Sequence, residues 1–324
     1  MSARPVVVVT RRLPDAVHEA VAGAFEARLN PDDTPMSADD LRQALGSADA
    51  LLTTVTDKVT AEVLSVEPRR ARLIANFGVG FNNIDVEAAK ARGGAVSNTP
   101  DVLTDATADL AITLLLMVAR RTGEGERHLR GGQWTGWRPT HMLGTHVTGK
   151  TLGLVGMGRI ARAVAQRAHH GFGMKVIYHD PFPPPADVAA ALGATQRGTL
   201  EEVLREADFI SLHCPATPET RHLINRDRLS LMRPEAFLIN TARGDVVDEA
   251  ALVEALAGRR IAGAGLDVFE REPQVTQALT TMDNIVLLPH LGSATTETRV
   301  AMGLRAFDNL QRFFAGQPLR DRVV

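Results

Sequence analysis

Three side chains with catalytic chemistry follow apolar, strand-like runs that lie far apart in the chain. They are Arg243 in Thr-Ala-Arg-Gly-Asp, Glu272 in Arg-Glu-Pro, and His290 in Pro-His-Leu-Gly. An α/β sheet delivers its functional loops at the ends of such strands. A guanidinium can hold a substrate carboxylate, a carboxylate can tune an acid, and an imidazole can pass a proton. Each residue alone is more often a surface charge or a local hydrogen-bond partner, so their interpretation depends on the motif that precedes them.

That motif is a glycine-rich turn between a strand-like run and a helical stretch over residues 160–168. Gly156 allows the tight turn, Gly158 lets backbone N–H groups approach a pyrophosphate, and Ala161 lets the helix pack closely on the strand. A second strand-like run ends at Asp180, 22 residues after Gly158, where an acid can meet the ribose hydroxyls of an adenosine. The pattern predicts a dinucleotide site. Two alternatives stay open: a Rossmann-like domain without nicotinamide, such as a methyltransferase, and an Asp180 that only caps its turn.

Composition excludes several classes of function. The chain has 324 residues, enough for about two domains. Its 36 basic and 38 acidic side chains give a net charge of −2, so no nucleic-acid partner is expected. A single cysteine, Cys214, excludes an internal disulfide and fits a reducing compartment, and it is expected to be a small wall residue rather than a nucleophile. The first residues lack a signal-peptide core, and the apolar stretch 104–120 is too short to cross a bilayer, so we expect a cytoplasmic protein without membrane contact.

Strand-like and helical runs alternate along most of the chain, which predicts an α/β protein with two parallel sheets. A first series of strands is expected at residues 6–10, 50–53, 73–75 and 95–96, with a helix at 15–22. A second series of six strands is expected at 152–155, 175–178, 209–213, 236–240, 263–267 and 285–288. A helix over 295–315 is expected to return to the first domain, so that the dinucleotide domain is inserted into it.

Residues 123–148 interrupt this rhythm with a polar arm that contains both tryptophans, Trp134 and Trp137. Tryptophan is enriched at subunit interfaces, so the arm predicts contact with a second copy of the chain. A loop packed on its own chain is the alternative.

The ordered motifs resemble the D-isomer-specific 2-hydroxyacid dehydrogenases. They are the glycine turn at 156, Thr-Ala-Arg-Gly at 241–244, Gly-Leu-Asp-Val-Phe at 265–269, Glu-Pro at 272, and Pro-His-Leu-Gly-Ser at 289–293. Gly-Val-Gly-Phe-Asn-Asn-Ile-Asp at 78–85 extends the similarity to nearly the whole chain. The tryptophan arm looks most like that of glyoxylate and hydroxypyruvate reductases. The resemblance implies a Rossmann dinucleotide domain, residues 101–289 with the arm, inserted into a flavodoxin-like substrate domain of residues 1–100 and 290–324.

The resemblance also implies roles for individual residues. Arg243 would clamp the substrate carboxylate, His290 would give the carbonyl oxygen its proton, and Glu272 would favour the charged imidazolium. Backbone N–H groups of Val79 and Gly80 would hold the carboxylate, unless that loop is a simple turn. Trp137 of the partner subunit would reach the site. Besides Gly156, Gly158, Asp180 and Arg243, the expected cofactor contacts are Arg159, Ile160, Cys214, Thr241, Ala242, Asp267 and Thr107. A hydrogen-bond acceptor at the end of a strand is an almost equally good interpretation of Asp267.

The expected activity is reduction of a small 2-oxoacid, with glyoxylate or hydroxypyruvate favoured, to the D-2-hydroxyacid in a homodimer without a metal. The acid at 180 favours NADH over NADPH because its charge would repel a 2′-phosphate. Formate dehydrogenases of this fold lack the Glu that stands here at 272, and phosphite dehydrogenases carry a Lys that the loop at 76–80 lacks. A corepressor-like protein that senses NAD(H) without turnover is the alternative.

Overall fold

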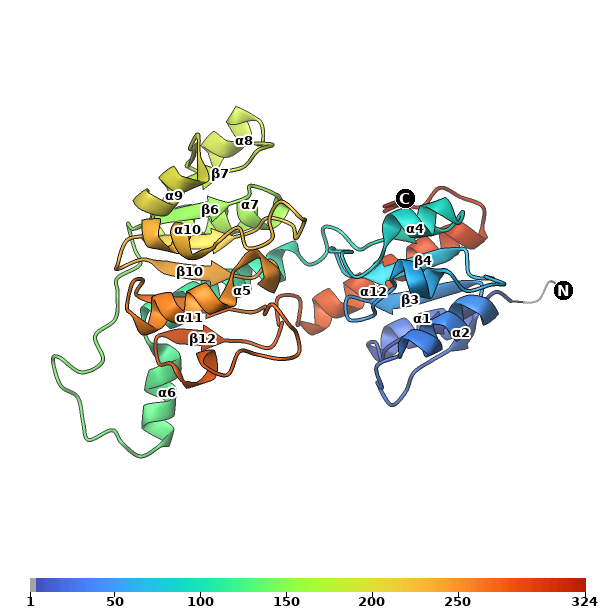
Figure 1. Ribbon diagram of the computed structural model, residues 1–324, viewed down its shortest axis with the longest axis horizontal. Coiled ribbons are helices and arrows are strands. Elements are labelled where there is room, and N and C mark those ends of the chain that lie inside the picture. The colour runs from blue at the N-terminus through green and yellow to red at the C-terminus, as the bar shows by residue number, and fades with distance from the viewer. Residues whose placement is uncertain (1–3) are drawn as a thin grey trace. The chain divides into compact units, whose positions relative to one another are not determined.

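The chain forms two compact units in a computed structural model that describes residues 4–324 (Figure 1). Unit 1 contains the chain up to Leu103 together with Ser293–Val324, and unit 2 is Thr104–Gly292. Both units are built on parallel sheets, which confirms the predicted α/β fold class. No helix among residues 4–324 is long and apolar enough to span a membrane.

Unit 1 has a five-stranded parallel sheet in the order β2-β1-β3-β4-β5, the flavodoxin-like order. Its central strands β1, β3 and β4 are almost wholly buried and mostly apolar because helices cover both faces, as the Val-Val-Val-Val of β1 illustrates. The strands are Val6–Val9, Glu26–Arg28, Ala50–Thr54, Leu73–Phe77 and Ala95–Ser97. The helices are α1 Asp15–Ala24, α2 Ala38–Ser47, α3 Ala61–Leu64, α4 Val86–Ala91 and α12 Thr296–Phe314.

Unit 2 has a seven-stranded parallel sheet in the order β12-β11-β10-β9-β6-β7-β8. The first six strands in sequence follow the Rossmann order, and the seventh extends one edge. The strands are β6 Thr151–Val155, β7 Lys175–His179, β8 Ala194–Gln196, β9 Phe209–Leu212, β10 Phe237–Asn240, β11 Gly263–Leu266 and β12 Ile285–Leu287. The sequence predicted six of these; the edge strand β8 is short and carries exposed polar residues, so no apolar run marked it. The edge strand β2 of unit 1 was missed for the same reason.

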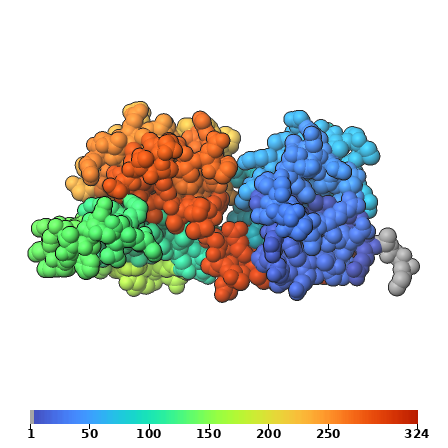
Figure 2. All heavy atoms as spheres, turned by 90° about the horizontal axis from the view of Figure 1, so that it is seen from below, coloured from blue at the N-terminus to red at the C-terminus, as the bar shows by residue number. Residues whose placement is uncertain are grey.

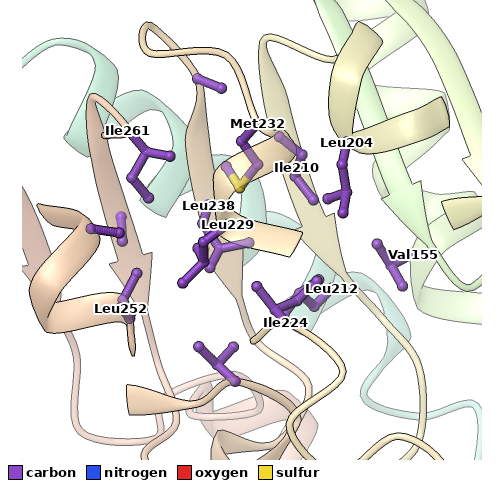
Figure 3. Close-up of a cluster of buried hydrophobic side chains, with 14 of the residues drawn as sticks. Val155, Leu204, Ile210, Leu212, Ile224, Leu229, Met232, Leu238, Leu252 and Ile261 are labelled. Atoms are coloured by element: carbon purple, nitrogen blue, oxygen red, sulfur yellow. The ribbon is translucent and has the colours of Figure 1, made fainter. Parts of the chain in front are cut away.

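Helices cover both faces of the sheet of unit 2. On one face, α5 Thr104–Ala119 and α7 Arg159–Gln166 pack on each other and on the strands. On the other face lie α9 Leu200–Glu206, α10 Arg226–Leu231 and α11 Glu249–Ala257, over a core that Figure 3 shows in close-up. That core is almost wholly aliphatic, as the small number of aromatic residues in the chain predicts. Shorter elements of the unit are the helix α8 Ala186–Ala191, a π-helical turn, Arg167–Gly171, that follows α7, and the 3-10 turns Gly244–Val246 and Leu279–Thr281.

The arm at residues 123–148 is partly helical. Its first part belongs to α6 Thr122–Arg130, where the sequence predicted only irregular chain. The arm extends from the sheet of unit 2 in Figure 1, and Figure 2 shows it as a green lobe at one end of that unit. Trp134 and Trp137 are 54% and 81% exposed, so the arm does not bury them against its own chain.

The packing of α12 on α1 within unit 1 generates a stability prediction from two glycines. A Cβ on Gly303 of α12 would lie 2.3 Å from a methyl group of Val17, whereas a Cβ on Gly23 of α1 would meet nothing within 4 Å. Gly303→Ala should therefore lower the free energy of unfolding by about 1–3 kcal/mol through overpacking. Gly23→Ala should raise it by about 0.5–1 kcal/mol because alanine favours the helix. Urea unfolding of both variants measures the difference, and equal gains in stability would contradict the close approach of the helices.

Candidate active site

The carboxyl ends of the parallel strands of unit 2 bring six loops to one edge of the sheet. Sheet order places them in a row: His290 after β12, Glu272 after β11, Arg243 after β10, Cys214 after β9, the glycine turn after β6, and Asp180 after β7. Strands lie about 4.8 Å apart, so Asp180 and the loop after β11 are separated by four spacings, or about 19 Å. The three candidate catalytic residues follow three adjacent strands, and the predicted nucleotide residues follow the next three.

The glycine turn has the geometry of an anion site. Gly156 has a φ of +89°, and a Cβ there would lie 3.1 Å from the backbone nitrogen of Cys214, so a side chain would be strained and crowded. Gly158 is the N-cap of α7, is exposed, and has no side chain that caps the helix. A Cβ at Gly158 would meet open space. The first N–H groups of a helix lack partners within it and favour negative charge, so this turn fits the pyrophosphate of a dinucleotide.

Asp180 holds its own loop and the glycine turn together. One carboxylate oxygen accepts a hydrogen bond from the backbone N–H of Met157 at 2.6 Å, and the other accepts one from Phe182 at 2.7 Å. The capping role considered from the sequence is therefore present. A carboxylate oxygen has more than one lone pair, so these bonds leave capacity for ribose hydroxyls.

The loop after β9 meets the glycine turn, and the loop after β10 follows the neighbouring strand. Burial, together with the charges of Asp180 and Asp245, raises the pKa of the Cys214 thiol to about 11, so Cys214 stays a neutral wall residue. His213 is kept neutral as well, because burial lowers its pKa to about 4. The hydroxyl of Thr241 is buried and makes no hydrogen bond within residues 4–324, which leaves a polar atom available at this edge of the sheet.

The turn that carries Arg243 is fixed by buried neighbours. Asn240 accepts a hydrogen bond from the N–H of Ala242 at 3.0 Å and donates one to the carbonyl of Arg243 at 2.9 Å. Gly244 lies so close to the loop after β11 that a Cβ would be 1.9 Å from the carbonyl carbon of Phe269. Burial lowers the pKa of Arg243, and the charges of Glu272 and Asp245 oppose that effect. A guanidinium nevertheless remains charged at neutral pH.

Glu272 and His290 form a direct pair. The Nδ1 atom of His290 lies 2.8 Å from a carboxylate oxygen of Glu272, and both side chains are about one-third exposed. Burial opposes ionisation of Glu272, but the hydrogen bond and charge of His290, the N–H of Phe269 and the charge of Arg243 lower its pKa overall. Glu272 is then a carboxylate at neutral pH and accepts a hydrogen bond from the N–H at Nδ1, which leaves Nε2 of His290 available for proton transfer.

Asp267 fixes the turn that presents His290. Its carboxylate accepts hydrogen bonds from the N–H groups of Leu291 at 2.6 Å and Gly292 at 2.8 Å, and its carbonyl accepts one from His290 at 2.9 Å. His290 has a φ of +55°, a left-handed conformation that is unfavourable for histidine and needs such support. The hydroxyl of Thr107 adds a bond to the carbonyl of Gly292 at 3.1 Å. Burial raises the pKa of Asp267, and these N–H groups and the charge of His290 oppose the rise.

Further residues support the Glu272 loop, and no pattern in the sequence predicted them. His222 lies 2.9 Å from a carboxylate oxygen of Glu270, two residues before Glu272. The buried Glu249, from α11, accepts bonds from the N–H of Glu270 at 2.6 Å and the hydroxyl of Thr276 at 2.5 Å. These partners lie 21 to 48 residues apart in the chain, so no local pattern could pair them.

In unit 1, the loop after β4 presents two backbone N–H groups. Asn76 donates a hydrogen bond to the carbonyl of Gly80 at 2.9 Å, and Asn98 donates one to the carbonyl of Val79 at 2.8 Å. The N–H groups of Val79 and Gly80 donate to no partner among residues 4–324. A Cβ at Gly78 would lie 2.5 Å from Val55, which explains the glycine there. The loop therefore offers two fixed donors suited to a carboxylate.

Comparison with known proteins agrees with this geometry. Residues 112–292 match the family model described as D-isomer specific 2-hydroxyacid dehydrogenase, NAD binding domain. The chain is 46% identical over 318 residues to a glyoxylate reductase from Thermococcus litoralis, which covers 97% of this chain and 95% of that protein.

Solved structures show the same similarity. The NADPH-dependent glyoxylate/hydroxypyruvate reductase from Sinorhizobium meliloti, in complex with NADP and malonate, superimposes with a TM-score of 0.88 at 37% identity, covering 99% and 97% of the two chains. The D-mandelate dehydrogenase of Rhodotorula graminis has a TM-score of 0.87 at 31% identity, covering 99% and 98%.

The chain belongs to the D-isomer-specific 2-hydroxyacid dehydrogenase family. The match to the NAD-binding model confirms a domain for a nicotinamide dinucleotide and disfavours a methyltransferase-like domain. These relatives are named as reductases and dehydrogenases, so a corepressor-like role is not favoured.

The bonds that Asp267 makes predict a local effect of its substitution. Asp267→Asn replaces one carboxylate oxygen, which accepts a hydrogen bond, by an amide NH₂ group, which donates one. This NH₂ group then faces a backbone N–H of the His290 turn, so that two donors oppose each other. The unfolding free energy should fall by about 1–3 kcal/mol, because a buried donor loses its partner. Hydrogen exchange at the amides of Leu291 and Gly292 should accelerate.

The matched control is Asp32→Asn, at an exposed position in unit 1, which should change neither quantity. Unaltered protection of the two amides in Asp267→Asn would show that other contacts hold the turn.

Proposed function

We propose that this protein reduces a small 2-oxoacid to the D-2-hydroxyacid with a nicotinamide cofactor, and that glyoxylate or hydroxypyruvate is its substrate. The observation that carries the proposal is the 2.8 Å contact of His290 with Glu272. This pair follows strands of the same sheet edge at which the Arg243 turn and the glycine turn lie. The similarity to glyoxylate reductases over nearly the full length supports the choice of substrate.

When bound, a nicotinamide cofactor would supply the hydride that reduces the carbonyl carbon of the oxoacid. Arg243 holds the substrate carboxylate and polarises the carbonyl oxygen, a bidentate task suited to a planar guanidinium. His290 donates the proton on Nε2 to that oxygen, and Glu272 stabilises the imidazolium through Nδ1. In the reverse direction His290 accepts the proton. The N–H groups of Val79 and Gly80 bind a carboxylate oxygen of the substrate.

The two units then take different roles. Unit 2 is the dinucleotide-binding domain, and unit 1 is the substrate domain. Gly156, Gly158, Arg159 and Ile160 hold the pyrophosphate at the start of α7. Cys214 borders the cofactor between its two halves. A further set lines the nicotinamide half of the cofactor: Thr107, Thr241, Ala242, Arg243 and Asp267. The buried, unpartnered hydroxyl of Thr241 supports this assignment best.

Two substitutions test the His290–Glu272 pair. His290→Ala should lower kcat by about 10² to 10⁴ because it removes the proton donor. Glu272→Gln should move the alkaline limb of oxoacid reduction to lower pH, because a neutral amide stabilises a charged imidazolium less than a carboxylate does. Steady-state pH profiles with each variant measure both effects.

His222→Asn is the matched control, since it removes a histidine–glutamate pair that supports the same loop through Glu270 but leaves the contact of Glu272 with His290 in place. It should leave the position of the limb unchanged. A Glu272→Gln profile that coincides with that of the native protein would remove Glu272 from the proton-transfer pair.

We further propose that NADH is preferred over NADPH. The carboxylate of Asp180 stands where an adenosine ribose would bind, and it would repel a 2′-phosphate. Strand β8 brings the backbone of Arg197 beside Tyr178, with an N–H to carbonyl distance of 2.7 Å. The guanidinium of Arg197 is bonded to Glu206 at 2.8 Å and 3.0 Å, so its charge is already paired. The related Sinorhizobium meliloti enzyme is NADPH-dependent, so the preference rests on these residues alone.

The cofactor prediction follows from that charge. The ratio of kcat/KM for NADH to that for NADPH should be at least about 10, equal to about 1.4 kcal/mol. Asp180→Ala should lower this ratio. Asp187→Ala, at an exposed acid of α8, should leave the ratio unchanged. Equal or better use of NADPH by the native protein would contradict the assignment.

We also propose a homodimer in which the arm contacts a second copy. The arm exposes four large apolar side chains: Leu129, Trp134, Trp137 and Leu143. Two hollows in unit 2 lie beside the start of the arm and are lined in common by Met117, Gly123, Asp283, Ile285 and Val286. Exposed apolar residues beside hollows are typical of an interface, and Trp137 of the partner subunit is the residue proposed to reach the substrate.

Light scattering tests the assembly. The native protein should have the mass of a dimer, and the double variant Trp134→Ala/Trp137→Ala should dissociate at least about 10-fold more readily, as expected when interface tryptophans are removed. Leu304→Ala, at an exposed leucine of α12, is the control. A native monomer with full activity at working dilution would overturn both the dimer and the role of Trp137.

A further inference from the structure

Phe182 is the most exposed large apolar side chain among the described residues, with 89% of its surface accessible. Single exposed apolar residues are common on protein surfaces and need no explanation by themselves. The position and the backbone of Phe182 distinguish it from the others. It lies two residues beyond Asp180, in the loop between β7 and α8.

The backbone around Phe182 is held firmly. Its N–H donates to one oxygen of Asp180 at 2.7 Å, while the other oxygen of that carboxylate accepts the N–H of Met157 in the glycine turn at 2.6 Å. The Asp180 carboxylate thus links the backbone of Phe182 to the glycine turn, where the pyrophosphate of the proposed cofactor would bind. Pro181 fixes its own φ, and Pro183 restricts Phe182 to extended conformations. The aromatic ring is exposed on a preorganised backbone.

An uncharged segment after β9 lies at the same edge of the sheet as the Phe182 loop. The charge of Asp180 contributes, after burial, to the raised pKa of the Cys214 thiol, so the end of β9 lies within electrostatic reach of Asp180. Cys214 and the exposed Pro215 carry no charge. An adenine attached to a ribose at Asp180 would emerge between this uncharged segment and the Phe182 loop.

We propose that Phe182 stacks on the adenine ring of the bound dinucleotide and sets the affinity for its adenosine half. The inference rests on the proposed use of a nicotinamide dinucleotide. Every base has a π-face, and stacking on an exposed aromatic ring needs no hydrogen-bond recognition. Because the backbone is already fixed, little conformational entropy is lost when the base binds. Phe182 is a positioning residue, since the reacting atoms lie at the other end of the cofactor.

Binding of cofactor fragments to the full-length protein tests the proposal without turnover. Calorimetry measures Kd for NADH, for ADP-ribose, which carries the adenosine half, and for reduced nicotinamide mononucleotide, which lacks it. Phe182→Ala should weaken NADH and ADP-ribose by the same factor, about 5- to 100-fold, as expected for loss of one stacked base. Affinity for the mononucleotide should not change.

Further variants separate stacking from simple apolar contact and from misfolding. Phe182→Trp should retain the native affinity for ADP-ribose. The affinity of Phe182→Leu for ADP-ribose should lie between those of the native protein and Phe182→Ala. Leu304→Ala removes an exposed apolar side chain in unit 1 and should change no Kd.

Three results would overturn the inference. One is native affinity of Phe182→Ala for ADP-ribose. Another is an equal loss for the mononucleotide, which would indicate a general defect of the site. The third is an unchanged Kd with a changed oligomeric mass, which would make Phe182 an interface contact. Failure of the proposed cofactor use is distinguishable, because the native protein would then bind neither NADH nor ADP-ribose. Failure of the proposed reaction alone would leave NADH binding intact without turnover of any 2-oxoacid.

Discussion

The parallel alignment of seven strands in unit 2 is the constraint on which the site depends. Parallel strands end at one edge, so residues from 156 to 290 meet there although the chain separates them widely. Sheet order then decides which loops are neighbours. Arg243, Glu272 and His290 follow adjacent strands, and the glycine turn and Asp180 follow the strands on the other side of β9. A dinucleotide laid along this edge would have its adenosine at Asp180 and its nicotinamide near the three catalytic candidates.

Close backbone contacts make this edge rigid. Gly244 touches the loop that carries Glu272, and Asp267 bonds to three consecutive residues of the loop that carries His290. The left-handed backbone of His290 persists because these bonds support it. The pairing with Glu272 then fixes the imidazole, so that Nε2 is the atom free to exchange a proton. Catalysis by such a site relies on groups held in place before the substrate arrives.

Apolar runs and glycines predicted most of the fold, because buried parallel strands are continuously apolar and the nucleotide turn requires glycine at fixed positions. The edge strands β2 and β8 were missed because they are short and polar, and α6 was missed because its residues carry no apolar stripe. The sequence also identified Arg243, Glu272 and His290 as candidates through their motifs. It could not show the bonds of Asp267 to the His290 turn or of Glu249 to the Glu270 loop, since both depend on how distant strands and helices are aligned.

Transfer of deuterium tests the central claim most directly. The native protein is mixed with hydroxypyruvate and NADH deuterated at the reactive position of the nicotinamide ring, and the product is analysed by mass spectrometry and chiral chromatography. The account predicts D-glycerate with one deuterium on carbon 2, because the hydride passes directly from cofactor to carbonyl carbon while the proton from His290 goes to oxygen. Tight binding of NADH without transfer of deuterium to hydroxypyruvate, glyoxylate or any other 2-oxoacid would contradict it.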